Sequence, residues 1–335
     1  MIGYYIHHRG RGHLSRALAI AAELEQPVTG LSSLAPPAEW RGDWLRLPAD
    51  GAESPVDAEG HGRLHWAPLG HAGLRTRMAR IAGWIDERRP RALVVDVSVE
   101  VGLLARLHGV PVVTIAMPGQ RTDAAHELGF ALADAVIGAW PPQATGMADG
   151  LPDLGGRLHA VGAISRFAPV AGPEPEGGVR RGGARRVVVL GGAGGDTFTA
   201  DAVGRARDAT PGWAWTHLGA NGSWTEDPWA TLVDASVVVT HAGESAIAEV
   251  AAARRPAIVI PQPRPHDEQL RTAAVLADAR WPTTVVPRWP TIGWPGLLHA
   301  ADELDGGDWQ AWNDGGGAHR AAAIIAATAD RAAST

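Results

Sequence analysis

A turn between a strand and a helix in the second half of the sequence has residues suited to binding phosphate. Residues 236–240 (SVVVT) predict a buried strand, and residues 241–245 (HAGES) form a small-residue turn that begins a helix. The first N–H groups of a helix have no partner within it and lie at the positive end of its dipole, so they bind anions. Gly243 lets a ligand approach the backbone, and Ser245 adds a hydroxyl donor. We therefore expect a diphosphate at this turn.

Glu249 lies about one turn further along the same predicted helix, where a carboxylate can accept hydrogen bonds from both hydroxyls of a ribose. Its neighbours in AIAEVAAA are small and apolar, and an unpaired carboxylate among them would be costly, so we favour a functional role over a solvated one. His241 either contacts the same ligand or caps its own turn, and we favour the contact. Two more segments follow strands and would face the same edge of the sheet: the glycine loop 191–195 (GGAGG) and residues 261–269 (PQPRPHDEQ).

In the first half, residues 7–13 (HHRGRGH) connect a predicted strand, Ile2 to His7, to a helix. A glycine loop of this kind is common in α/β proteins, so by itself it is a weak sign of function. His7 and His8 suggest a metal pair, but adjacent strand residues face opposite sides and no carboxylate is near them in sequence. We favour a structural role for these two histidines.

Short apolar runs alternate with helical patterns along the whole chain, which predicts an α/β protein built on parallel sheets. Further strands are predicted near residues 28–31, 92–97 and 110–115 of the first half, and at 257–260 of the second. The 335 residues exceed one typical core, so two domains are expected. We place them at 1–166 and 186–317, with a Pro- and Gly-rich linker at 167–185 and a final helical segment, 318–335, that could pack back across the junction.

Composition excludes several functions. The sequence has no cysteine, so disulfides, thiolate nucleophiles and Cys-ligated metals are ruled out. A net charge of -6 argues against a broad nucleic-acid surface. The sequence has no run of about 18 apolar residues, which a membrane-spanning helix would need, and no export signal is visible at the start. We therefore expect a cytoplasmic protein. Residues 74–84, with arginines at 75, 77 and 80, could form a membrane-surface helix for a lipid acceptor, but we favour a solvated helix face, and membrane contact is peripheral at most.

The GRGH loop, the THAGESAIAE segment and the PQPRPHDEQ segment, in this order, resemble the GT-B glycosyltransferases, in the branch with the peptidoglycan lipid N-acetylglucosaminyltransferase and the UDP-glycosyltransferases. The resemblance implies two Rossmann-like domains around a deep cleft, with the nucleotide-sugar donor on the second domain. It further implies that the glutamate at 249 holds the ribose, that residues 268 and 269 bind donor-sugar hydroxyls, and that the nucleobase of the donor lies near residues 224 and 225. The donor-side residues are Gly12, Gly191, Gly192, Ala193, Trp224, Thr225, His241, Gly243, Glu244, Ser245, Glu249, Glu268 and Gln269.

The resemblance implies that His13 faces the cleft, and a neutral imidazole can take the proton of an acceptor hydroxyl as the glycosidic bond forms. Asp96, at the end of the strand ALVVD, would fix its tautomer. The charge of the leaving nucleotide would be met by helix and loop amides, so we expect an inverting transfer that requires no metal and no cofactor. The acceptor-side candidates are Ser98, Glu100, Gln120, Arg121 and Asp123, although Arg121 and Asp123 could instead pair at the surface.

The donor is expected to be a UDP- or dTDP-sugar, and the acceptor a small-molecule or lipid-linked compound. Fold alone does not determine reaction, so two alternatives stay open: a nucleotide-sugar epimerase of the same architecture, and a non-catalytic nucleotide-sugar-binding partner protein. The many tryptophans are expected in the core, with Trp224 as the exception.

Overall fold

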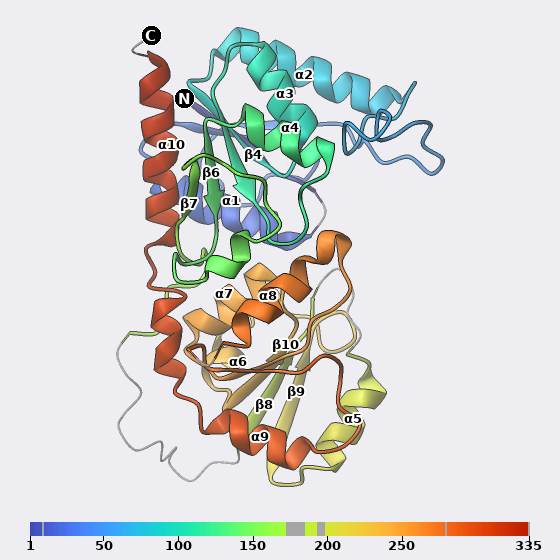
Figure 1. The fold of residues 1–335 in the computed structure, drawn as a ribbon, viewed down its shortest axis with the longest axis vertical. Helices are drawn as coiled ribbons and strands as arrows, with labels where there is room; N and C mark the ends of the chain where they lie inside the picture. Colours follow the sequence, from blue (N-terminus) through green and yellow to red (C-terminus); the bar gives the residue numbers. More distant parts are fainter. Residues whose placement is uncertain (9, 172–184, 193–197, 279, 334–335) are drawn as a thin grey trace.

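The computed structural model describes residues 1–8, 10–171, 185–192, 198–278 and 280–333, which form two α/β domains stacked along the long axis of the molecule (Figure 1). In the described part of the N-terminal domain, seven strands form one sheet in the order β3-β2-β1-β4-β5-β6-β7, and all neighbouring strands are parallel. The strands are β1 (Ile2–Tyr5), β2 (Val28–Ser32), β3 (Trp44–Arg46), β4 (Ala92–Asp96), β5 (Val112–Ala116), β6 (Ala135–Gly138) and β7 (Leu158–Ala160). The helices are α1 (Arg11–Glu23), α2 (Ala72–Arg88), α3 (Val99–Leu107) and α4 (Ala124–Leu132), with a short 3-10 helix, η1 (Thr145–Ala148).

Helices cover both faces of this sheet, as buried parallel strands require. On one face Ala17 and Ile20 of α1 pack with Ile2, Tyr4 and other strand residues. On the opposite face, α2 and α3 pack on the alternate strand residues, and the buried side chains there include Ile81, Trp84, Val101 and Ala105. The β1–α1 connection thus ends at the carboxyl edge of the sheet, where open α/β sheets bind ligands.

The C-terminal domain repeats the scheme on a smaller sheet, with the order β12-β11-β10-β8-β9 among the described strands, again all parallel. Its strands are β8 (Arg185–Leu190), β9 (Trp213–Leu218), β10 (Val237–Thr240), β11 (Ala257–Val259) and β12 (Thr283–Val285). Its helices are α5 (Ala200–Asp208), α6 (Trp229–Val233), α7 (Glu244–Ala252), α8 (Glu268–Leu276) and α9 (Trp294–Asp302), with 3-10 helices η2 (Pro265–Asp267) and η3 (Gly306–Ala311). The predicted α/β class is confirmed, and tryptophans 281, 294 and 309 are buried in this domain.

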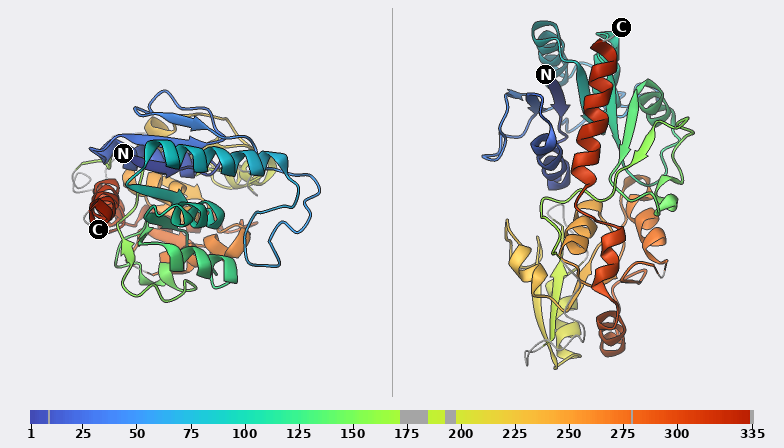
Figure 2. Two further views of the ribbon diagram at one scale, coloured as in Figure 1. Left: turned by 90° about the horizontal axis from the view of Figure 1, so that it is seen from above. Right: turned by 90° about the vertical axis from the view of Figure 1, so that its left-hand side faces the viewer.

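The last helix, α10 (Gly317–Ala333), returns to the N-terminal domain and packs beside α1 (Figures 1 and 2). Its buried residues Ala321, Ile325 and Ala329 belong to the same apolar cluster as Ile20 of α1. The chain therefore passes between the domains twice. The first passage includes Pro169 and the second includes Gly315, and the two residues lie next to each other. Most of the predicted linker, residues 172–184, lies outside the described residues.

Several predicted strands are one or two residues shorter than expected. The first ends at Tyr5 rather than His7, and the strand at 92–97 ends at Asp96. Val97 has a φ of 65°, in the left-handed region that β-branched residues rarely adopt, so it cannot continue the strand. Strained residues of this kind are concentrated at functional sites, and Val97 lies beside the cavity described next.

Candidate active site

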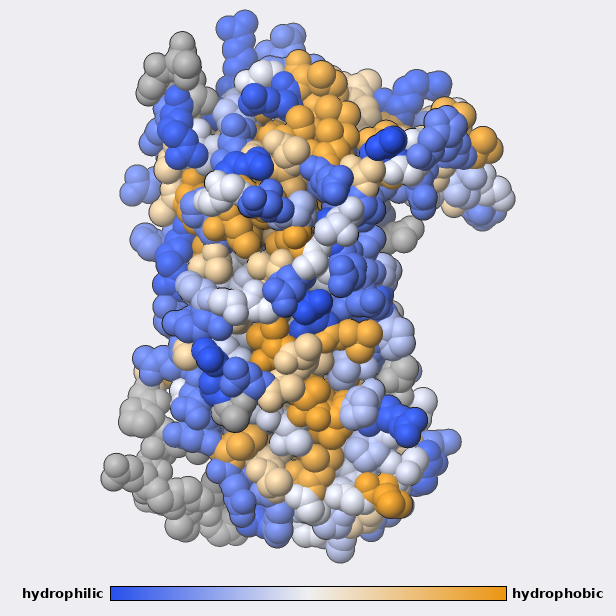
Figure 3. Space-filling model, viewed as in Figure 1, coloured by the Kyte–Doolittle hydropathy of each residue, from blue (hydrophilic) through white to orange (hydrophobic). Residues whose placement is uncertain are grey.

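A cavity of about 870 Å³ separates the two domains. Residues from both domains line it, including His13, Arg16, Glu244 and Glu249. Ion pairs join the domains around it: Arg11 with Glu226 at 3.1 Å, Arg121 with Glu268 at 3.6 Å and Arg271 with Asp149 at 3.2 Å. On the face drawn in Figure 3, hydrophilic residues gather across the middle of the molecule, where the domains meet.

Two helix N-termini face each other across this cavity. The N-cap of α1 is Gly10 and that of α7 is Gly243, and neither cap forms a side-chain hydrogen bond to its helix. Their first turns approach closely, because a Cβ atom on Gly12 would collide with the Ser245 hydroxyl. Backbone N–H groups from both domains are therefore directed at one space, which suits a phosphate group.

His13 and Asp96, predicted as base and partner, are brought together. Nδ1 of His13 lies 3.1 Å from Oδ1 of Asp96, and the carboxylate is fully buried. Burial alone would raise the pKa of Asp96, but the charges of Arg16 and then His13 hold that pKa well below its usual range. Asp96 is thus ionised and can accept the Nδ1 proton of His13, which turns Nε2 into the proton acceptor of the ring.

Arg16 completes this group, although the sequence analysis did not select it. It is buried, and its Nη2 donates to both carboxylate oxygens of Asp96, at 2.9 and 3.1 Å. Its Nη1 lies 3.4 Å from Oε2 of Glu244 in the other domain. The signal that marks Arg16 is its position on α1: three residues after His13 and four before the buried Ile20, it lies on the side of the helix that packs inward.

Glu244 occupies the first position of α7 and is buried as well. Burial raises its pKa to about 7, against the opposing charge of Arg16. Its second oxygen, Oε1, has no hydrogen-bond partner among the described residues. The predicted donor-side residue is thus also a link between the two domains.

Glu249 lines the cavity one turn further along α7. Its Oε1 accepts a hydrogen bond from Nε of Arg166 at 2.9 Å, and Arg166 also donates to the backbone oxygen of Glu226. Burial raises the pKa of Glu249, and the charge of Arg166 opposes the shift. The carboxylate is neither solvated nor unpaired, and its residue lines the cavity.

The segment after β11 contributes two more predicted residues. Glu268 lines the cavity and pairs with Arg121 of the N-terminal domain. Gln269 is buried, and its Oε1 accepts from the backbone N–H of Gln262. His241 lines the cavity, and its Nδ1 accepts from the N–H of Gly243, so this histidine does cap its own turn.

The remaining donor-side residues surround the outer part of the cavity. Trp224 is half exposed, and the guanidinium of Arg11 lies over its ring at 5.3 Å. Thr225 lines the cavity too, while its hydroxyl forms a turn with the backbone of Asp227. Of the glycine loop, Gly191 and Gly192 line the cavity, and Ala193 lies outside the described residues.

Most acceptor-side candidates hold loops of the N-terminal domain. Ser98 caps α3 and lines the cavity. Glu100 accepts hydrogen bonds from the backbone N–H groups of His65 and Trp66. Gln120 is exposed, and its backbone N–H donates to the carbonyl of His266 across the domain boundary.

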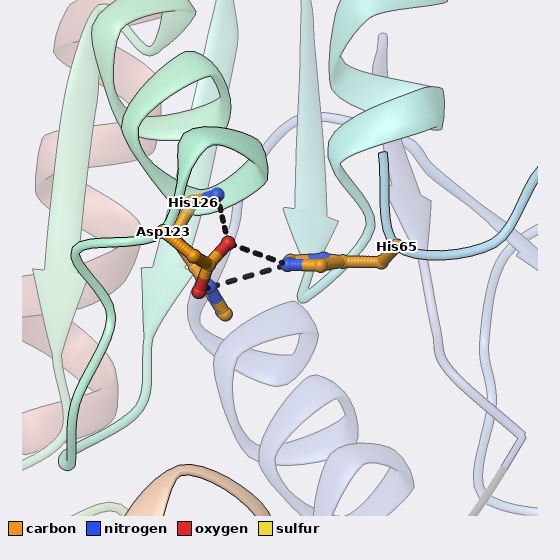
Figure 4. A group of neighbouring side chains, drawn as sticks. All are labelled: His65, Asp123 and His126. Atoms are coloured by element: carbon orange, nitrogen blue, oxygen red, sulfur yellow. Dashed lines mark hydrogen bonds and ion pairs between the residues drawn. The ribbon is translucent and has the colours of Figure 1, made fainter. Parts of the chain in front are cut away.

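The suggested surface pairing of Arg121 with Asp123 is wrong. Arg121 is buried, and its guanidinium contacts Glu268 and His126. Asp123 instead caps α4 and pairs with His126. His65, Asp123 and His126 form a compact group that the sequence analysis missed (Figure 4). Asp123 and His126 are three residues apart at the start of one helix, but His65 comes from a loop without a periodic pattern, and no local signal joins it to them.

The geometry of this trio favours a hydrogen-bonded network over a metal centre. Nη1 of Arg121 lies 2.9 Å from Nε2 of His126, and a guanidinium can only donate, so the ring proton stands on Nδ1 and faces Asp123 at 2.5 Å. A metal at Nδ1 would have to replace this proton while Arg121 holds the other nitrogen. Burial lowers the pKa of His126 to about 4, which keeps the ring neutral.

A second cavity of about 210 Å³ opens beside the first, inside the N-terminal domain. His7, His65, Val97 and Ser98 line both cavities. The smaller one also has apolar walls from Trp66, Leu74 and Met78 and the acidic groups Asp50 and Glu100. The two cavities therefore adjoin at the four residues that they share.

Comparison with known proteins agrees with this architecture. The model of the glycosyltransferase family 28 C-terminal domain matches residues 228–284, which contain α6, β10, α7, β11 and α8. The crystal structure of Acinetobacter baumannii MurG superposes with a TM-score of 0.63 and 16% identity, over 97% of this chain and 99% of that one. The fold is GT-B. The predicted architecture and the resemblance to GT-B glycosyltransferases are thereby confirmed.

Two other proteins extend the comparison. The UDP-N-acetylglucosamine--N-acetylmuramyl-(pentapeptide) pyrophosphoryl-undecaprenol N-acetylglucosamine transferase of Sorangium cellulosum (strain So ce56) is 29% identical over 256 residues, 64% of this chain. The chain spans 60% of the length of this curated relative. The spinosyn rhamnosyltransferase SpnG, solved with thymidine diphosphate, has a TM-score of 0.53 and 16% identity, over 100% of this chain and 96% of that one. Among the described residues, no helix is both long and apolar enough to span a bilayer.

Proposed function

We propose that this GT-B protein is an inverting glycosyltransferase that moves a sugar from a UDP- or dTDP-sugar to an acceptor hydroxyl or similar nucleophile, with His13 as the base. The observation that carries the proposal is the convergence, in one interdomain cavity, of the uncapped N-terminus of α7 with the His13–Asp96 pair. One binds a leaving diphosphate and the other takes a proton, which are the two tasks of sugar transfer from a nucleotide.

In the proposed mechanism the acceptor oxygen attacks the anomeric carbon as the bond to the diphosphate breaks. Nε2 of His13 takes the acceptor proton, and Asp96 stabilises the imidazolium that forms. The electron pair of the broken bond goes to the diphosphate, whose charge meets the N–H groups at the starts of α7 and α1. This arrangement supplies positive potential without requiring a metal at the diphosphate.

The donor is assigned to the C-terminal domain. Ser245 would contact the diphosphate, which Gly243 allows to approach the backbone, while Glu249 would contact the ribose and Trp224 the nucleobase. Glu244 lines the cavity and its Oε1 has no hydrogen-bond partner among the described residues, so this oxygen would accept a hydrogen bond from a donor-sugar hydroxyl. The curated relative is named as a transferase from a UDP-sugar and SpnG was solved with thymidine diphosphate, which supports either pyrimidine nucleotide here.

The acceptor is assigned to the N-terminal domain, with its reactive hydroxyl at His13 and an adjoining group in the 210 Å³ cavity. That cavity has the apolar walls and acidic rim that suit a small ring bearing hydroxyl groups. A small-molecule or lipid-linked compound fits this description. Nucleic acid does not, because the chain is acidic overall.

The test incubates the protein with UDP- and dTDP-sugars, with and without a panel of hydroxylated acceptors. Acceptor-dependent release of the nucleoside diphosphate supports transfer. Release of an epimerised donor without acceptor would instead assign an epimerase, and binding by calorimetry without turnover would assign a binding partner. If calorimetry detects no nucleotide binding at all, the proposed function is wrong.

A further inference from the structure

Four buried or nearly buried side chains meet where the two domains touch, and the proposed mechanism uses only two of them. His13 and Arg16 come from α1, Asp96 ends β4, and Glu244 begins α7. The exposed fractions of the last three side chains are 5%, 0% and 8%, so their charges are poorly screened by water. We call the four residues His13, Arg16, Asp96 and Glu244 the Arg16 network.

Within this network Arg16 and Asp96 compete for one nitrogen of His13. Oδ1 of Asp96 lies 3.1 Å from Nδ1, and Nη2 of Arg16 lies 3.3 Å from the same atom. If Asp96 has this contact, Nδ1 carries the proton and Nε2 has a lone pair for an acceptor hydroxyl. If Arg16 donates to Nδ1, the ring proton must stand on Nε2, and His13 cannot act as a base at that atom.

The position of the guanidinium decides between the two states. Asp96 holds Nη2 on one side, and Glu244 holds Nη1 on the other at 3.4 Å. Glu244 belongs to the other domain, so its pull on Arg16 exists only while the cleft is closed. The opening of the cleft, or the loss of the Glu244 charge, leaves Arg16 to its partners in the N-terminal domain, which are Asp96, His13 and the sulfur of Met117.

We propose that Glu244 is a positioning residue for the base: across the closed cleft its carboxylate holds Nη1 of Arg16, so that Nη2 keeps its shorter contacts with Asp96 in preference to the 3.3 Å contact with Nδ1 of His13. Asp96 then accepts the Nδ1 proton, and Nε2 is free to accept another. This inference rests on the proposed function, and it makes the base competent only when both domains enclose the substrates. The tautomers of His13 interconvert when one ring nitrogen releases a proton to water and the other takes one up, so protons balance and no further reactant is needed.

Charged groups from four elements face Glu244 and set its ionisation. Arg16 of α1 favours the ionised form, as does Arg121 from the loop after β5, while Glu268 of α8 and Asp96 of β4 oppose it. Together with burial, the largest effect, they give Glu244 a pKa of about 7. The device is therefore active above pH 7, where Glu244 is ionised, and fades as the pH falls below it.

The first experiment observes the ring of His13 directly. Nitrogen-15 NMR of the histidine-labelled full chain distinguishes the Nδ1–H from the Nε2–H tautomer, and the His13 signals are assigned by their loss in His13→Gln. At pH 8 the wild type with bound UDP is expected to be mainly Nδ1–H. Glu244→Gln, which keeps the size of the side chain but not its charge, is expected to shift the ring to Nε2–H.

The second experiment measures turnover against pH. The kcat of Glu244→Gln is expected to fall about 10- to 100-fold at pH 8, a part of the ~10²–10⁴ that a general base contributes. Below pH 6 the two enzymes are expected to converge, because the wild-type carboxyl is then protonated. A merely structural role would instead lower kcat by the same factor at every pH.

Asp149→Asn is the matched control, because it removes another acidic partner of an interdomain ion pair, that of Arg271, outside the Arg16 network. It should leave the His13 tautomer and the pH profile unchanged. Should Glu244→Gln fail to fold, the wild-type tautomer followed from pH 8 to pH 6 gives the same answer. If the His13 tautomer stays the same in all these comparisons, the inference is overturned. If the tautomer changes as expected but the protein transfers no sugar in the turnover assay, the proposed function is overturned, and the control of the tautomer by Glu244 still stands.

Discussion

Gly12 of the N-terminal domain lies so close to Ser245 of the C-terminal domain that even one methyl group on Gly12 would meet the Ser245 hydroxyl. The two residues belong to the first turns of α1 and α7, the helices whose N-termini face the cavity. The contact therefore measures how far the cleft is closed, and it explains why glycine stands at this position of the GRGH loop.

Gly12→Val should keep the domains apart. The added side chain cannot fit against Ser245 unless the cleft opens, so the KM for the donor is expected to rise about tenfold or more, with a lower kcat, because closure aligns the reacting atoms. Steady-state kinetics measures both. Gly212→Val is the control, since a Cβ there meets no atom within 4 Å; equal kinetics in the two variants would contradict the role of the contact.

His13→Ala should leave nucleotide binding almost unchanged and slow turnover. Removal of the base costs about 10²–10⁴ in kcat, whereas the diphosphate and ribose contacts stay. Calorimetry with UDP and single-turnover kinetics separate the two effects. Turnover at the wild-type rate would show that His13 is not the base.

Glu249→Ala should weaken UDP binding by about 1.5–3 kcal/mol, roughly 10- to 150-fold, because a charged acceptor of hydrogen bonds is lost and Arg166 is left without this partner. Glu249→Gln keeps an acceptor oxygen, so its affinity for UDP is expected to lie between those of the wild type and Glu249→Ala. Calorimetry with UDP and with free pyrophosphate provides the control: pyrophosphate has no ribose, so its affinity should change much less. If the affinities for UDP and for pyrophosphate fall by the same factor, the substitution has disturbed α7 as a whole and the assignment of Glu249 to the ribose is contradicted.

Asp96→Asn should destabilise the fold as well as the base. It leaves Arg16 buried without its principal partner, which costs about 3–5 kcal/mol in the free energy of unfolding. The pKa of Asp96 is depressed in the folded protein, so the ionised carboxylate stabilises the wild type at neutral pH, and this contribution decreases as the pH falls from about 5 towards 2.

Chemical denaturation across that pH range measures the effect. The wild type should lose stability relative to Asp96→Asn as acid is added, so the gap between the two curves should narrow. A constant gap would mean that the charge of Asp96 contributes nothing to the fold.

The sequence was sufficient for the strand–turn–helix at 236–249, because a buried strand, a glycine turn and an apolar helix follow one another locally. The resemblance to a known family implied that His13 faces the cleft, and Asp96 was paired with it because it ends a strand. Arg16 was missed because its partners are remote in the chain: Asp96 is 80 residues away and Glu244 is 228. Only the packing of one domain against the other shows that an arginine on the inner side of α1 has two carboxylates to meet.

The same limit applies to the acceptor side. Ser98 and Glu100 were selected because they follow a strand, but such a position does not tell whether a side chain faces a ligand or holds a neighbouring loop. Glu100 holds the loop at His65, a contact that joins residues 35 positions apart. Val97 ended its strand one residue early because its backbone turns left-handed, and no propensity predicts a β-branched residue in that conformation.

The return of α10 to the N-terminal domain determines how the molecule can move. Two neighbouring segments, at Pro169 and Gly315, connect the domains on the same side, and two adjacent attachments resist twisting and sliding far better than one. The motion that remains is a rotation of one domain relative to the other about an axis through the two connecting segments. Opening of the cleft, substrate entry and product release would all follow this rotation. A protease cut between residues 314 and 317 would remove one of the two connections, and with it this restriction on how the domains move.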